Sequence, residues 1–208
     1  MTFEGEKTPL VVVESGIGQA LRPSLTQSLL TMLQQGRSLN LIGPAGQGRE
    51  RLLMDLCQAA PTQEVCIVSL NIRQYARNYN ALLAAFWQQI HPQGQAPSKK
   101  PKTMAQLVTA LAAEKRPVWI LLHQMDALHV NAGADPLYNL AFFDHLNSLR
   151  NKCGIGVLVT TESLAVMRIL LTHDGQHTLS PLSMSHQSLP VLSRDEIQAE
   201  LYNANCPR

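Results

Sequence analysis

The stretch Leu39-Asn-Leu-Ile-Gly-Pro-Ala-Gly-Gln-Gly-Arg-Glu50 decides the fold of this chain. Its first four residues predict a short buried strand, and the three glycines that follow within six residues predict a tight turn. A helix is predicted over 49–60, because Leu52, Leu53 and Leu56 lie at helical spacing. Backbone N–H groups at the start of such a helix attract anions. The stretch therefore predicts a strand, a glycine-rich turn suited to phosphate, and a helix.

The two chemically decisive positions of this turn depart from the usual P-loop pattern, G-x-x-x-x-G-K-[ST]. Arg49 stands in place of the lysine, and Glu50 stands in place of the hydroxyl residue. A carboxylate there would face a polyanion, and like charges about 4 Å apart repel by roughly 4 kcal/mol at an effective dielectric near 20. Without a ligand, the same glycines would make a plain turn, and Glu50 would favour the helix macrodipole. We expect a degenerate nucleotide-binding loop formed by Gly43, Gly46, Gly48, Arg49 and Glu50.

Composition indicates one globular domain over residues 1–208. The chain is 45% hydrophobic and 15% charged, and its formal net charge of +2 is too small to indicate nucleic acid by itself. Four cysteines form no C-x-x-C pair and are expected to be reduced. The amino end is polar and acidic, and no apolar run reaches the length of a membrane span. We expect a cytoplasmic protein that does not associate with membranes.

Alternating apolar runs and helical patterns predict an α/β fold for the core, over about residues 20–200. Strands are predicted at 39–42, 64–71, 117–122, 155–160 and 187–191. Helices are predicted at 23–35, 49–60, 79–90, 103–115, 136–150, 164–171 and 193–203, with Gly36 ending the first and Thr103 capping the fourth. Residues 92–102 are expected to form a surface loop. The order predicts a three-layer P-loop NTPase-like domain with a mostly parallel five-stranded sheet.

A family resemblance becomes specific at the third predicted strand. Val118-Trp-Ile-Leu-Leu122 is followed by His123-Gln-Met-Asp126-Ala-Leu128. This segment resembles the Walker B segment of AAA+ and STAND ATPases, which runs apolar strand, Asp-Glu, one residue, Asp and an apolar pair. His123 and Gln124 stand in the positions of the first Asp and the Glu, and only Asp126 matches.

Other segments are similar to the same families, especially to their origin-recognition and STAND-like members. A helix precedes the first strand, Asn71 closes the second, Thr160-Thr161-Glu162 resembles the sensor 1 strand end, and 189–197 resembles the segment that enters the helical lid. The resemblance implies that Asp126 and Thr160 join the loop in the nucleotide site. It also leads us to expect that the lid is missing, because the chain ends soon after the last predicted helix.

The resemblance implies binding without hydrolysis. The missing Asp and Glu are the residues that anchor magnesium and orient the attacking water, and phosphoryl transfer depends almost wholly on such positioning and electrostatics. We therefore expect no catalytic residue and a pseudo-ATPase that acts as a structural or regulatory subunit of a larger assembly. Its expected partner is a protein, such as an active ATPase in a hetero-oligomer or ring, and ATP or ADP is the cofactor to test.

Two alternatives stay open. A divergent ATPase would use Arg49 for phosphate, and Asp126 with Glu50 for magnesium. A DNA-associated accessory factor would place a basic patch on backbone phosphates, and its candidate residues are Arg73, Arg77, Lys99, Lys100 and Lys102. No structural metal is expected, because His173 and His177 fall in a segment that reads as a loop.

Overall fold

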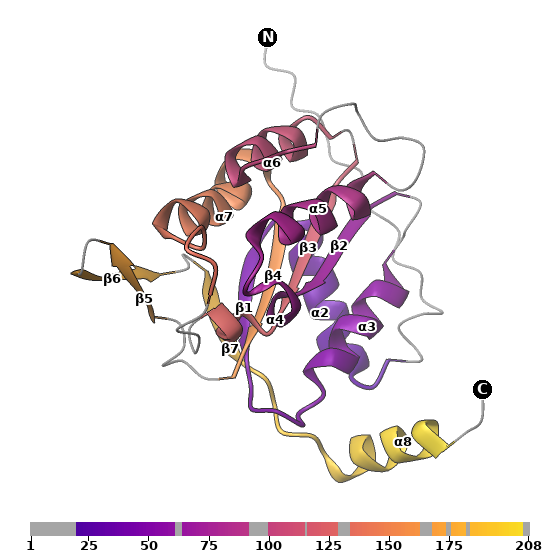
Figure 1. Ribbon diagram of the computed structural model, residues 1–208. Coiled ribbons are helices and arrows are strands. Elements are labelled where there is room, and N and C mark those ends of the chain that lie inside the picture. The colour runs from indigo at the N-terminus through magenta and orange to yellow at the C-terminus, as the bar shows by residue number, and fades with distance from the viewer. Residues whose placement is uncertain are drawn as a thin grey trace.

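The computed structural model describes residues 20–60, 64–91, 100–114, 116–128, 134–162, 168–173, 176–181 and 184–205. Five strands form one parallel sheet in the order β2-β3-β4-β1-β7 (Figure 1). They are β1 (Ser38–Ile42), β2 (Cys66–Asn71), β3 (Val118–His123), β4 (Gly156–Thr161) and β7 (Ser185–Ser188). The predicted α/β fold with a mostly parallel five-stranded sheet is confirmed.

Helices cover both faces of the sheet (Figure 1). One face carries α2 (Pro23–Gln34) and α3 (Arg49–Ala59). The other carries α4 (Ile72–Tyr75), α5 (Tyr79–Ile90), α6 (Met104–Ala112) and α7 (Leu140–Cys153). The last helix, α8 (Arg194–Asn205), extends away from the sheet (Figure 1). Over the residues that the structure describes, no helix is both long and apolar enough to cross a membrane.

The middle of the sheet follows from its apolar sequence. Every residue of β1, β3 and β4 is buried, as expected for parallel strands covered on both faces. Strand β3 lies inside the sheet, between β2 and β4. This arrangement places the last residues of β3, β4 and β1 side by side at one edge.

Local signals in the sequence fix several helix starts. Thr103 caps α6, since its hydroxyl accepts a hydrogen bond from the Gln106 N–H at 3.3 Å, which confirms the predicted cap. Ser193 and Glu196 form a reciprocal capping box at the start of α8. The Ser193 Oγ accepts from the Glu196 N–H at 3.2 Å, and a Glu196 oxygen accepts from the Ser193 N–H at 2.7 Å.

A β-hairpin stands where the sequence predicted a helix over 164–171 and a loop over 172–185. It consists of β5 (Arg168–His173) and β6 (Gln176–Pro181), which pair antiparallel. A short apolar run such as 169–171 does not separate strand from helix by periodicity alone. The dipeptide Asp174-Gly175, which is typical of a two-residue hairpin turn, indicates a hairpin more strongly than the apolar run indicates a helix. His173 and His177 thus belong to two paired strands and not to a loop.

Two smaller differences concern the other connections. The short helix α4 lies between the predicted strand 64–71 and the predicted helix 79–90, where no element was predicted from the sequence. At its start, the Asn71 side chain accepts from the Arg73 N–H at 3.0 Å. Strand β7 begins two residues before the predicted 187–191 strand. Residues 92–99, including Lys99, lie outside the described part of the chain.

One side chain pairs with the backbone at the middle of the exposed edge strand β2. The Gln89 amide of α5 donates to the Ser69 carbonyl at 3.0 Å and accepts from the Ser69 N–H at 2.8 Å. These two bonds take the places that a neighbouring strand would use. Gln89 therefore protects this edge against pairing with another chain.

Candidate functional site

The candidate site lies where three neighbouring strands end. The Gly43 N–H, directly after β1, donates to the Thr161 carbonyl of β4 at 3.0 Å. Inside the sheet, the buried Asn40 amide donates to the Thr161 hydroxyl at 3.0 Å. These bonds hold the glycine turn beside β4 and close to the end of β3. Ligands of open parallel sheets bind at this carboxyl edge.

Two glycines give the turn its shape. Gly46 has φ +84° and Gly48 has φ +73°, both in the left-handed region that favours glycine. A Cβ atom at Gly46 would meet nothing within 4 Å, so the backbone conformation, and not crowding, requires glycine there. Gly48 directly precedes α3, so the turn sets the position of the N-terminal end of that helix.

A hollow of about 420 Å³ opens at this turn. Four of the predicted nucleotide-binding residues line it: Gly46, Gly48, Arg49 and Glu50. Gly43, Thr160 and Asp126 do not line it. Its volume lies within the range of ligand pockets, roughly 300–1,000 Å³.

Arg49 is the buried cation of the hollow. Its side chain is 6% exposed, and its Nη2 donates to a Glu162 carboxylate oxygen at 3.3 Å. Its Nη1 is also buried and has no hydrogen-bond partner within the described structure. A buried donor without a partner is costly, and a guanidinium binds phosphate as well as carboxylate. Arg49 lines the hollow and thus carries a donor that has no partner within the described structure.

Glu50, His123 and Thr160 form a chain of hydrogen bonds. A Glu50 oxygen lies 3.0 Å from His123 Nε2, and His123 Nδ1 lies 2.9 Å from the Thr160 hydroxyl. An ionised carboxylate only accepts, so Nε2 carries the proton, and Nδ1 of the neutral ring accepts from Thr160. The same hydroxyl oxygen accepts from the Gln124 N–H at 3.3 Å. Each group in the chain therefore has a defined partner.

The His123 ring is neutral at pH 7. Burial lowers the pKa of His123 below its ordinary value, and Arg49 lowers it further, while Glu50 and Asp126 oppose this in part. The contact with Glu50 is thus a hydrogen bond to a neutral ring and not an ion pair. Both ring nitrogens are engaged, so His123 is not free to take a proton from water. Glu50 is the acid among the described lining residues, and its carboxylate is hydrogen-bonded to His123.

Several lining residues were not predicted from the sequence. They are Leu21, Ala45, Arg51, His123, Gln124 and Leu192. Leu21 and Leu192 come from segments far apart in the chain and both approach Gly48, where a Cβ atom would lie 3.7 Å and 3.8 Å from their methyl groups. No periodic pattern marks either leucine as a site residue. Gln124 has φ +54°, an uncommon backbone conformation for a residue other than glycine.

The buried Arg22 ties the segment before α8 to the start of α2. Its Nη2 donates to the Pro190 carbonyl at 2.8 Å, and its Nε lies 3.5 Å from a Glu196 oxygen. Pro190 and Glu196 flank Leu192 in the sequence. This contact therefore helps to keep Leu192 at the hollow.

The predicted basic patch is only partly described. Arg73, Arg77, Lys100 and Lys102 are exposed, and Lys99 lies outside the described residues. The Tyr79 hydroxyl accepts from the Met104 N–H at 2.8 Å, which brings together the segments that carry Arg77 and Lys102. Tyr79 itself is buried against Tyr138 and Phe142. Its ring is therefore not free to stack on a base.

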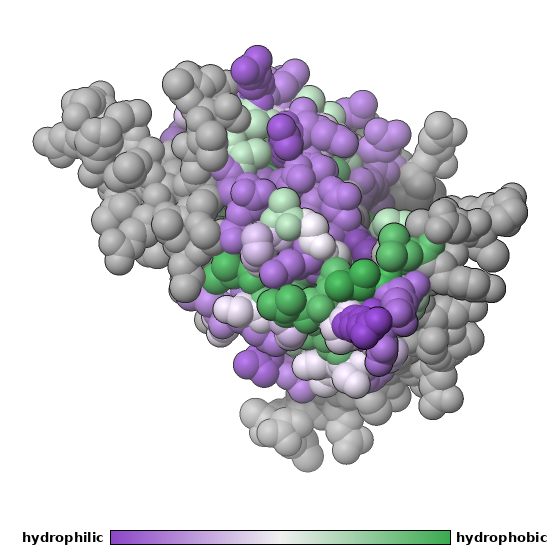
Figure 2. Space-filling model, turned by 90° about the horizontal axis from the view of Figure 1, so that it is seen from below, coloured by the Kyte–Doolittle hydropathy of each residue, from purple (hydrophilic) through white to green (hydrophobic). Residues whose placement is uncertain are grey.

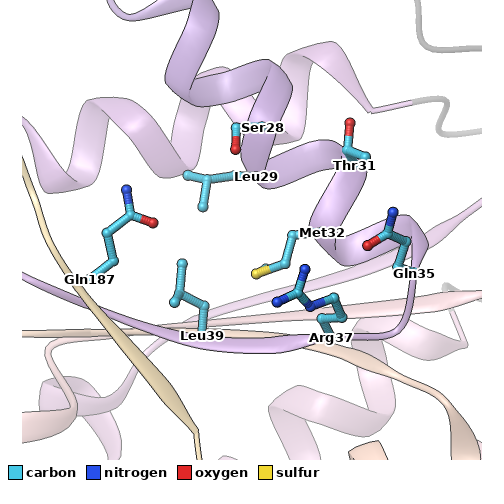
Figure 3. Close-up of a pocket in the computed structure, with 8 residues that line it drawn as sticks. All are labelled: Ser28, Leu29, Thr31, Met32, Gln35, Arg37, Leu39 and Gln187. Atoms are coloured by element: carbon cyan, nitrogen blue, oxygen red, sulfur yellow. The ribbon is translucent and has the colours of Figure 1, made fainter.

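A second hollow, of about 470 Å³, lies between α2 and β7 (Figure 3). The Arg37 guanidinium reaches over it beside Met32, and Gln187 faces it from β7 (Figure 3). Arg37, Gln35 and Gln187 are all exposed. The hollow at the glycine turn, which holds the buried Arg49, is therefore the better candidate for a ligand site.

The segment around α8 exposes apolar side chains. Val191 is 77% exposed, Leu201 59% and Ile197 45%, and the last two are four residues apart in α8. Figure 2 views the molecule from the side of the glycine turn and α8, and shows a band of apolar surface across this face.

Comparison with known proteins identifies the fold. No protein-family model matches the sequence, and a comparison with curated proteins gave no match. Among solved structures, Drosophila ORC bound to DNA is 15% identical, with a TM-score of 0.64, and the match covers 92% of this chain and 49% of that one. The ADP form of the Aeropyrum pernix ORC2 protein is 16% identical, with a TM-score of 0.56, and the match covers 96% and 54%.

A third structure, the replication initiator DnaA bound to AMPPCP and single-stranded DNA, is 12% identical, with a TM-score of 0.54. The match covers 99% of this chain and 57% of that one. The chain thus spans about half the length of the structures that it matches. At these identities the likeness concerns the fold. The chain has the fold of the AAA+ P-loop ATPases of the origin-recognition type, as the sequence resemblance implied.

Proposed function

We propose that this protein is a non-hydrolysing P-loop subunit, which binds a nucleotide at the glycine turn and serves as a structural or regulatory component of a protein assembly. The observation that carries this proposal is the contrast between the two sides of the hollow. On one side, the buried Arg49 keeps a donor without a partner beside the left-handed glycine loop. On the other side, His123 stands where the resemblance places a metal-binding acid, and both of its nitrogens are engaged.

The exposed apolar surface around α8 supports the protein partner. Val191, Ile197 and Leu201 offer large side chains to solvent in and just before α8. Burial of apolar surface contributes roughly 25 cal/mol per Å² to association, less the entropy lost on binding. A partner on this surface would sit next to the nucleotide, so occupancy of the hollow could be sensed by the assembly.

Calorimetric titration with ADP tests the nucleotide site. Loss of a hydrogen bond from a charged group costs about 1.5–3 kcal/mol, so Arg49→Ala is expected to weaken ADP binding by at least roughly tenfold. Arg49→Lys, which restores the usual P-loop residue, should bind ADP at least as well as the wild type. Arg37→Ala removes an exposed arginine from the other hollow and should leave the affinity unchanged.

Two results would contradict the proposal. Absence of ADP binding at millimolar concentration, with all variants folded by circular dichroism, would remove the nucleotide site. Magnesium-dependent ATP turnover that falls on Asp126→Ala would establish the divergent ATPase in place of the non-hydrolysing subunit.

A DNA-associated accessory factor is the second candidate function. Four exposed basic side chains support it, Arg73, Arg77, Lys100 and Lys102, and so do the DNA-bound structures of similar fold. Removal of Arg73 and Arg77 together is expected to weaken duplex binding and to reduce the salt slope of log K by about 2. Fluorescence anisotropy over a range of salt measures both quantities. Binding that does not change with salt, or with these substitutions, would exclude this candidate.

A further inference from the structure

We propose that the hollow at the glycine turn binds the polyphosphate of a nucleoside diphosphate directly, without the divalent cation that a P-loop ATPase holds beside its nucleotide. This inference rests on the nucleotide-binding function proposed above. It specifies a nucleoside diphosphate as the ligand of that site and states that no divalent cation binds there with it.

The residues at the expected metal position do not fit magnesium. Mg²⁺ requires near-octahedral oxygen ligands, whereas imidazole nitrogens suit zinc, copper, iron or nickel. His123 stands in the place of the first Walker B acid, and its two nitrogens bind Glu50 and Thr160 at 3.0 Å and 2.9 Å. Glu50, in the place of the neutral hydroxyl ligand, is held by His123. The His123 position thus offers no oxygen ligand, and one of the two Glu50 oxygens is engaged by His123.

Asp126 does not replace the missing ligands. It is the one acid that matches the Walker B pattern, and it lies in the short 3₁₀ helix Met125–Leu128 after β3. It is absent from the residues that line the hollow. Within the described ranges, no three His, Cys, Asp or Glu side chains come together as a metal site. A cation bound at Asp126 would therefore lie outside the hollow.

Protein groups supply the positive charge that the cation would otherwise provide. Arg49 is more than nine-tenths buried, is paired with Glu162 through Nη2 and keeps Nη1 without a partner. Arg51, which is paired with Asp55 at 2.7 Å, also lines the hollow. The start of α3, a helix of 11 residues, adds backbone N–H groups and the positive end of its dipole. Together these groups form an anion site that needs no metal.

Glu50 limits the charge of the ligand. Its carboxylate is 70% exposed at the rim and is kept there by the His123 ring. An added γ-phosphate would bring more negative charge toward this carboxylate without magnesium to shield it. The site should therefore prefer a diphosphate to a triphosphate.

The test measures ADP and ATP binding to the full chain by calorimetry, once in EDTA and once in excess Mg²⁺. We expect ADP to bind in EDTA and excess Mg²⁺ not to tighten this binding, because Mg²⁺ complexes the free nucleotide through its phosphates. ATP should bind more weakly than ADP. Glu50→Gln keeps an oxygen that accepts from His123 but removes the charge, so it should tighten ATP binding several-fold in EDTA. Glu50→Thr combined with His123→Asp restores the usual oxygen ligands and should make ATP binding depend on Mg²⁺.

The outcomes separate this inference from the proposed function. ADP binding in both conditions, lost on Arg49→Ala, supports both. Binding that appears only with Mg²⁺, or is tightened more than tenfold by it, overturns the metal-free site and leaves the nucleotide site standing. Absence of ADP binding in either condition overturns both. If the double variant fails to fold by circular dichroism, the wild-type comparison and Glu50→Gln still decide the question.

Discussion

Replacement of Gly36 by alanine is expected to lower the free energy of unfolding by about 3 kcal/mol. Gly36 follows α2 with φ +65°, a conformation that costs a residue with a Cβ roughly 1–2 kcal/mol. In addition, a Cβ atom there would lie 2.3 Å from the Gly154 carbonyl oxygen and 2.9 Å from its carbon. Both atoms belong to the backbone just before β4, so the clash cannot be relieved by a side-chain rotation. Urea unfolding followed by circular dichroism measures the effect.

Gly154→Ala is the matched control for this prediction. Gly154 has nearly the same backbone conformation, with φ +62°, but a Cβ atom there would meet nothing within 4 Å. Replacement of Gly154 by alanine should lower the free energy of unfolding only by the cost of the left-handed backbone conformation, about 1–2 kcal/mol. Equal losses for the two variants would show that the close approach of Gly36 to Gly154 does not contribute to stability.

Gly36 illustrates which features the sequence could predict. Its role as the residue that ends α2 follows from a local pattern, a helical repeat of leucines and then a glycine, and the structure confirms it. Its contact with Gly154 joins two segments far apart in the chain. That contact depends on how β4 pairs beside β1, which no local pattern contains.

Across the whole fold, too, elements with a strong local pattern were predictable and other features were not. The strands and helices around the glycine turn were predictable, because each carries a strong pattern of its own length. The β5–β6 hairpin was missed, because a short run such as Ile169-Leu170-Leu171 fits a strand and a helix equally well. There the Asp-Gly dipeptide carried more information than the apolar run.

The sequence could predict where the candidate site lies, but not which of its residues contact one another. The motif located the loop, and Gly46, Gly48, Arg49 and Glu50 do line the hollow. The sequence indicated Glu50 as a charge facing the ligand and His123 as a residue in the position of the first Walker B Asp. They bind each other across 73 residues, because β3 and β1 end at the same edge of the sheet. The two positions at which the sequence departs from the P-loop and Walker B patterns are thus in contact, which only the fold reveals.

Replacement of Asp55 by alanine is expected to cost about 3 kcal/mol of stability. Asp55 lies in α3 and is 1% exposed. One carboxylate oxygen accepts from the Leu21 N–H at 2.9 Å, and the other accepts from Arg51 Nε at 2.7 Å. Alanine would leave the Leu21 N–H without its partner and Arg51 without its counter-charge. Urea unfolding measures the loss, and Asp55→Asn, which keeps an acceptor without the charge, should lose less than alanine.

Asp144→Ala, an exposed aspartate in α7, is the control and should change the free energy of unfolding by less than about 0.5 kcal/mol. A loss at Asp55 no larger than this would mean that its two bonds do not stabilise the fold. The expected loss also bears on the site, because Asp55 holds both Leu21 and Arg51 at the wall of the hollow. Asp55→Asn should therefore weaken ADP binding more than Asp144→Ala does, although Asp55 itself does not line the hollow.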